Sequence, residues 1–101
     1  MKNDEINRTI KECFKSLDYR DNEIAKLNTS DLTAIDKNIE IFKKINLSLS
    51  ESIIKLTVLG KKIPENSGMQ KYINRLITVL NDSFHENKGA IKILQELKTA
   101  K

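Results

Sequence analysis

Residues that interrupt helices or form tight turns are scarce in this sequence. Its 101 residues include one Pro, three Gly, one Cys, one His and no Trp, and aromatic residues make up 5%. A β-sandwich or barrel needs turn residues about every 8–12 positions, so this composition excludes those folds. Hydrophobic residues make up 39% of the chain and are mainly Ile and Leu, which suit helix-on-helix packing. The sequence therefore predicts one all-α domain covering residues 1–101.

Groups that carry out covalent, metal or cofactor chemistry are equally rare. The single cysteine, Cys13, cannot form an intrachain disulfide, and beside Phe14 we expect it to be a small buried or half-buried apolar residue. Asp82 and His85 place two possible metal ligands on one helix turn, but di-iron bundles need paired Glu-x-x-His motifs and further carboxylates. Gly-rich phosphate loops and paired CxxC motifs are absent. We predict no enzyme activity, no cofactor and no metal site.

Long apolar runs are also missing. Residues 1–5 are polar apart from Met1 and lack the apolar core of a signal peptide. No stretch approaches the roughly 18 apolar residues that a membrane-spanning helix requires. We therefore expect no signal peptide, no membrane span and a cytoplasmic location.

The N-terminal third of the chain has helical periodicity. Asn3 is a candidate N-cap, and acidic residues follow it in the first turn. Residues 19–22 interrupt the apolar pattern, so the segment fits either one helix or a kinked helix, with a stop predicted at 28–30. The apolar positions of this segment are Ile6, Ile10, Phe14, Leu17, Ile24 and Leu27.

Two longer helices are predicted over residues 31–59 and 68–99. Between them, Gly60 suits a C-cap, Pro64 prevents continuation, and the motif at 67–70 is an S-x-x-Q capping box. A second capping-box motif, at 48–51, leaves a break in the middle helix open, and Gly89 leaves one open in the last. The middle segment repeats apolar residues at Leu32, Ile35, Ile39, Phe42, Ile45, Leu49, Ile53 and Leu56.

The two long segments are nearly equal in length and share a short connection, so they should form an antiparallel hairpin. Residues 3–28 then pack along it. The predicted fold is a three-helix antiparallel bundle built on a long helical hairpin. A four-helix bundle, split at 46–48 or at Gly89, is the alternative.

Charge is distributed unevenly. The net charge is +4, with acidic residues in excess before residue 40 and basic residues in excess after it. Lys clusters near the hairpin tip and along the last helix fit a basic patch for nucleic acid, anionic lipid or an acidic partner, or simply a solvated surface. Because 15 of the 18 cations are Lys and no aromatic residues alternate with them, nucleic acid is a disfavoured partner.

Several apolar residues lie outside the main periodic stripe, and we interpret them as a second stripe facing a partner. They are Ile41, Leu47, Ile54, Val58, Leu59 and Ile93. Combined with the basic clusters, this stripe predicts a non-enzymatic module that binds a protein partner through an apolar helix face. A homodimer that uses the same stripe is the structural alternative. The predicted partner-binding residues are Ile54, Val58, Lys61, Lys62, Lys88, Lys92 and Ile93.

The polar stretch at 22–27, the start of a long helix at 31–32 and the segments at 80–81 and 86–89 resemble flagellar and related type III export chaperones. The resemblance covers the layout of residues 20–99. It implies a helical, cytoplasmic chaperone that holds the aggregation-prone helical end of an export substrate. The basic charge departs from the usual acidic character of that family.

The segment 72–76, the Asn87–Lys88 pair and the closing Leu-rich helix look similar to the C-terminal half of the immunity proteins of pediocin-like bacteriocins. This resemblance covers about residues 60–99 and extends to the basic charge and the length. It implies a cytoplasmic protein that shields a membrane receptor complex from a bacteriocin. The long middle segment departs from the four comparable helices of that family.

Overall fold

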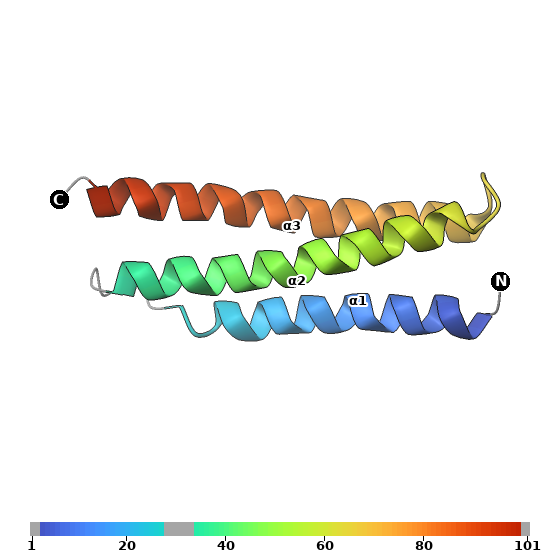
Figure 1. Ribbon diagram of the computed structural model, residues 1–101, viewed down its shortest axis with the longest axis horizontal. Helices are drawn as coiled ribbons and strands as arrows, with labels where there is room; N and C mark the ends of the chain where they lie inside the picture. Colours follow the sequence, from blue (N-terminus) through green and yellow to red (C-terminus); the bar gives the residue numbers. More distant parts are fainter. Residues whose placement is uncertain (1–2, 28–33, 100–101) are drawn as a thin grey trace.

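The computed structural model describes residues 3–27 and 34–99, which contain three helices and no strand (Figure 1). The helices are α1 (Asn3–Ile24), α2 (Ile35–Lys61) and α3 (Gly68–Thr99). In Figure 1, α2 lies between the other two and runs opposite to them. Both outer helices pack on α2, and contacts between α1 and α3 are sparse. The predicted three-helix antiparallel bundle is confirmed, as an elongated molecule of 54 × 20 × 15 Å.

Helix α1 is continuous through the polar residues 19–22. They do not kink it because the Arg20 side chain packs across the bundle, where it donates to the Ser83 hydroxyl at 3.1 Å, while it also pairs with Asp21 at 2.9 Å. Asp4 and Glu5 occupy the first turn, where negative charge favours the helix dipole. The stop predicted at 28–30 lies outside the described residues.

Helix α2 runs without a break through the capping-box motif at 48–51. The Ser48 hydroxyl donates to Ser16 of α1 at 3.2 Å instead of capping a new helix. The C-cap predicted at Gly60 is wrong, because the helix continues to Lys61 and its C-cap is Lys62. Gly60 is buried, and a Cβ there would lie 3.7 Å from both Gln70 and Ile73 of α3. These are ordinary van der Waals distances, so the α2–α3 contact would accommodate an Ala side chain at this position.

Helix α3 begins at a genuine cap. The Ser67 hydroxyl accepts a hydrogen bond from the Gln70 backbone N–H at 3.1 Å, which confirms half of the predicted capping box. The Gln70 side chain does not complete it, since its Oε1 is buried without a hydrogen-bond partner among the described residues. Gly89 does not split the helix, which continues to Thr99. The four-helix alternative is therefore wrong.

The core lies where α1 and α3 both meet α2. Its fully buried side chains come mainly from the predicted α2 stripe, with matching residues from α3. On α1, Cys13 is only 1% exposed while Phe14 is 46% exposed, so the prediction that Phe14 belongs to the buried stripe is wrong. A small inward residue lets α1 approach α2 closely. The largest fully buried side chains are Ile45, Leu49, Leu56, Ile73, Leu80 and Cys13.

Hydrogen-bonding residues cross the middle of the bundle in what we call the polar layer. Between α1 and α2, the Ser16 and Ser52 hydroxyls lie 2.6 Å apart. Between α2 and α3, Asn87 donates to Asn46 at 3.0 Å, and Asn46 donates to the Phe84 carbonyl at 3.3 Å. Because buried polar groups are costly unless paired, these bonds fix the axial position of each helix. The polar layer comprises Ser16, Arg20, Asn46, Ser48, Ser52, Ser83 and Asn87.

Burial raises the pKa of the Cys13 thiol above its ordinary value, and a hydrogen bond with the Ser52 side chain partly opposes that shift. We expect a thiol reagent to modify native Cys13 at least about tenfold more slowly than the unfolded chain, because reaction requires opening of the α1–α2 contact. The unfolded chain loses the thiol proton at lower pH than the native protein. Stability should therefore fall as pH rises past the ordinary thiol pKa of 9.0. Equal modification rates with and without denaturant would contradict this burial.

Candidate protein-binding face

Three large aliphatic side chains of α2 face solvent on the side turned away from the core. Leu47, Ile54 and Val58 are 65%, 61% and 49% exposed. At 100° per residue, Ile54 lies half a turn away from the fully buried Ile45, nine positions earlier. The three residues therefore form one row opposite both α1 and α3. We call this row the α2 stripe.

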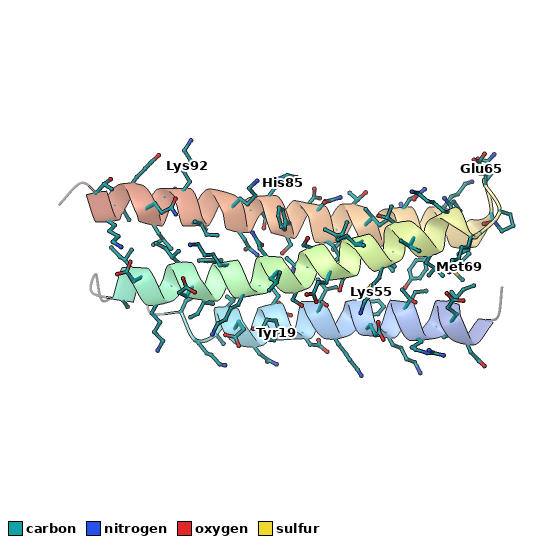
Figure 2. All side chains as sticks on the ribbon, viewed as in Figure 1. Tyr19, Lys55, Glu65, Met69, His85 and Lys92 are labelled. Atoms are coloured by element: carbon teal, nitrogen blue, oxygen red, sulfur yellow. The ribbon has the colours of Figure 1, made fainter. Side chains whose placement is uncertain are left out.

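The α2 stripe borders a hollow of about 260 Å³ between α1 and α2. Leu47 forms one wall of the hollow, and Tyr19 forms another; Figure 2 labels Tyr19 on α1. Tyr19 is itself 37% exposed, so an apolar side chain entering the hollow would meet an aromatic ring as well as Leu47. Lys44, Ser48 and Glu51 complete the lining. Such a hollow beside a row of aliphatic residues can receive an anchoring side chain of a partner.

Basic residues flank the α2 stripe. Lys43, Lys44 and Lys61 are exposed and form no ion pair within the described ranges. Lys55 and Lys62 instead bind Glu12 and Glu5 of α1, at 3.2 and 3.3 Å; Figure 2 places Lys55 between α2 and α1. Exposed pairs of this kind contribute about 0–1 kcal/mol each. They steady α1 against α2 and leave the three other lysines available to an acidic partner.

The structure separates the predicted partner-binding residues into groups. Ile54, Val58 and Lys61 lie together on the outer side of α2, while Lys62 turns toward α1. On α3, Lys88 and Lys92 are one turn apart, and the Lys88 ammonium lies 5.6 Å from the centre of the Phe84 ring. Ile93 is 60% exposed, but helical geometry directs it away from Lys88 and Lys92. The seven residues do not form one site.

Two members of the predicted second stripe are not available to a partner. Ile41 is 6% exposed and Leu59 is 2% exposed, so this part of the prediction is wrong. Both residues lie on the flank of α2 that α1 covers. No sequence pattern indicated that Tyr19 and Lys44 line a shared hollow, because their proximity depends on how α1 docks on α2.

A second hollow, of about 340 Å³, lies at the hairpin tip between α2 and α3. Thr57, Lys61, Gln70 and Asn74 contribute polar groups to it, and the unpartnered Gln70 Oε1 lies among them. His85 is remote, exposed and packed edge-on against Phe84 at 5.8 Å. No three His, Cys, Asp or Glu residues gather into a metal site in the described part of the chain.

Comparison with known proteins identifies no relative, since no family model, curated protein or solved structure matches the chain. Within residues 3–27 and 34–99, no helix is long and apolar enough to cross a membrane. The α2 stripe and its flanking charges are therefore the basis on which a function can be proposed.

Proposed function

We propose that this protein is a non-enzymatic helical module that binds a protein partner on the outer face of α2. The supporting observation is the exposure of Leu47, Ile54 and Val58 in one row opposite the core. Single exposed aliphatic residues are common on protein surfaces. A row of three, extending over three turns and ending beside an aromatic hollow, provides the spacing that an amphipathic helix needs to dock.

The flanking charges suit a partner helix with acidic residues on either side of its apolar face. Lys43, Lys44 and Lys61 would meet those carboxylates, while Glu40 and Glu51 would disfavour a uniformly acidic chain. Electrostatic complementarity of this kind raises the rate and selectivity of association more than its affinity. Apolar contact with Ile54 and Leu47 would supply most of the binding free energy.

An export chaperone or adaptor is the biological role that this mode of binding fits best, because such proteins hold helical segments of their substrates. A bacteriocin immunity protein is the second candidate, and its support is the resemblance of residues 60–99 to that family. Nucleic-acid binding is the third, and it rests on the excess of Lys alone. It would be recognised by a steep loss of binding as salt concentration rises.

The test uses two isoleucines of equal exposure. Ile54 on α2 is 61% exposed and Ile93 on α3 is 60% exposed, so I54E and I93E make the same chemical change at equally accessible sites. Proteins retained from the source cell's lysate by each variant and by wild type should be quantified at low and high salt. We expect I54E to retain at most about 10% of the amount of one protein partner that wild type retains, because a buried charge disrupts an apolar contact. We expect I93E to retain as much of that partner as wild type does.

Retention of the partner by I54E but not by I93E would place the binding site at the end of α3. If neither variant retains the partner, the loss follows from placing a charge at any exposed isoleucine. The α2 stripe is then not identified as the binding site. Recovery of nucleic acid, lost at high salt, would favour the third candidate.

A further inference from the structure

Three exposed residues on the outer side of α2 follow one another at heptad spacing. They are Leu47, Ile54 and Lys61, and we call them the heptad row. A straight α-helix falls about 20° short of two full turns over seven residues. The heptad row therefore slants across the outer side of α2 instead of running parallel to its axis. At 1.5 Å per residue, its two ends lie about 21 Å apart along the helix.

Each end of the heptad row reaches one of the two hollows. Leu47 lines the hollow that it shares with Tyr19 of α1, which we call the aromatic hollow. Lys61 lines the hollow at the hairpin tip, which we call the tip hollow and which Gln70 of α3 also lines. Figure 2 labels one lining residue of each hollow, Tyr19 and Glu65. Since α2 lies between α1 and α3 (Figure 1), the two hollows lie on opposite flanks of α2.

The slant of the heptad row matches the way in which two helices pack. Helices that meet along heptad rows cross at about 20°, so a straight partner helix laid along this row passes from one hollow to the other. Ile54 and Val58, at 61% and 49% exposure, would lie beneath its middle. Residues of the partner that are two heptads apart would reach the two hollows.

The tip hollow adjoins a polar atom that the described chain leaves without a hydrogen bond. Gln70 Oε1 is buried and has no partner among the described residues. The Gln70 amide packs over Gly60, where a Cβ would lie 3.7 Å from Oε1 and 3.8 Å from Nε2. Because the terminal torsion of a Gln side chain is soft, Oε1 can turn into the hollow of about 340 Å³. A buried carbonyl without a donor is costly, so a partner that supplies the donor gains affinity.

A carboxamide is the donor that suits the tip hollow. Lys61 and Glu65 line it with opposite charges, so a charged group of either sign would meet one like charge. The neutral amide of a Gln side chain avoids this repulsion, and it can donate to Gln70 Oε1 while accepting from Nε2. The bundle contains an amide pair of this kind in its interior, where Asn87 donates to Asn46 at 3.0 Å.

We propose that the occupant of α2 is a single helix of another protein, crossing α2 at about 20° with a large apolar side chain in the aromatic hollow and a Gln side chain in the tip hollow. The inference rests on the proposed function and adds the crossing angle and the two end contacts. Acidic residues beside the partner's apolar row would meet Lys43 and Lys44, which are exposed. A second copy of this chain fits less well. A two-fold axis at Ile54 would bring Leu47 of the partner subunit to the tip hollow and leave Gln70 Oε1 unpaired.

A synthetic three-heptad peptide, stapled so that it is helical as a monomer, tests the proposal. It carries Leu along one face, Glu on both sides of that face, Phe at one end of the face and Gln two heptads away. The heptad row does not fix the chain direction of the partner, so a second peptide has the reverse order. Isothermal titration calorimetry measures binding. We expect one of the two peptides to bind wild type, and I54E to weaken that binding at least about tenfold.

Paired substitutions identify the two end contacts. Q70L in the protein, or Leu in place of the peptide's Gln, leaves one amide unpaired and should weaken binding about three- to tenfold. Both changes together leave no amide unpaired, so binding should return to within about threefold of the original. Tyr19→Ala and replacement of the peptide's Phe by Ala should together weaken binding by less than the product of their separate effects, because each removes the same contact.

Two controls match the tip contact. Q95L makes the same change as Q70L at an exposed position of α3 and should bind the peptide as wild type does. A peptide of the same composition, with Gln one heptad from Phe instead of two, should bind equally to Q70L and to wild type. Urea unfolding should show that Q70L is no less stable than wild type, because it removes an unpaired buried oxygen. A purely structural role of Gln70 would instead lower stability and leave binding unchanged.

Binding that is lost in I54E but shows no coupling between Gln70 and the peptide's Gln would overturn the oblique crossing and leave the proposed function in place. Failure of wild type to bind either peptide, or binding that I54E does not weaken, would also overturn the crossing. The proposed function is tested separately by the partner that I54E and I93E retain.

Discussion

Replacing Leu49 by Ala should lower the free energy of unfolding by about 2–5 kcal/mol, a large part of the roughly 5–15 kcal/mol that stabilises a domain of this kind. Leu49 is 0% exposed and lies in the core between the two outer helices. Removing its isobutyl group takes away apolar burial and leaves a cavity that rigid helix backbones cannot fill. Urea unfolding followed by circular dichroism measures the change, with an unaltered denaturant slope as evidence that the unfolded state is unaffected.

The matched control is Leu47→Ala, two residues away on the same helix. Leu47 is 65% exposed, so its truncation should change stability by no more than about 0.5 kcal/mol. If the proposed function is right, Leu47→Ala should instead weaken partner capture. Equal destabilisation by the two substitutions would show that α2 is rotated about its axis relative to the described core.

Substituting Asn87 by Ala should destabilise the protein by about 1–3 kcal/mol, although the side chain removed is polar. Asn87 is 5% exposed and donates to Asn46 at 3.0 Å. Its loss leaves the Asn46 Oδ1 buried without that donor, and the desolvation cost of an unpaired buried amide is of this size. Asn46→Ala should cost a similar amount, because it removes the same bond and the contact with the Phe84 carbonyl.

The double substitution Asn46→Leu/Asn87→Leu should be less destabilising than either single Ala change, since it leaves no polar atom of the pair unsatisfied. Urea unfolding of all four proteins measures the two single effects and the paired effect. If the free energy of unfolding of the double variant falls by about the sum of the two single decreases, the two amides act independently. A buried Asn can also fix the alignment of helices at a cost in stability, so the double variant tests whether alignment survives without it.

Much of the fold follows from periodicity that is local in sequence. The apolar repeat over residues 31–59 predicted the buried residues Ile35, Ile39, Ile45, Leu49 and Leu56. Ser67 marked the start of α3 because a side-chain cap involves neighbours within one turn. Ser48 and Gly89 had the same local signature of a break, yet both lie inside continuous helices. Their local preferences are outweighed by helix packing, which adds burial along the whole length of α2 and α3.

The candidate site could be predicted only in part. Ile54 and Val58 were selected because they fall outside the main stripe, and both are exposed on one face. Ile41 and Leu59 met the same criterion and are buried. Periodicity finds the centre of a buried face but not its width, which depends on how many neighbouring helices cover it and at what angle. The position of α1 on α2 decides that width here.

By itself, the sequence determined the helical class, the three-helix order, the hairpin connection and most of the α2 core, because these depend on composition and on spacing within single helices. Only the tertiary structure decided that Cys13 and not Phe14 faces inward, that Tyr19 meets Leu47, and that Arg20 of α1 reaches Ser83 of α3. Such relations join residues far apart in the chain. They depend on the rotation and axial position of whole helices, which the polar layer and the packing of buried side chains fix together.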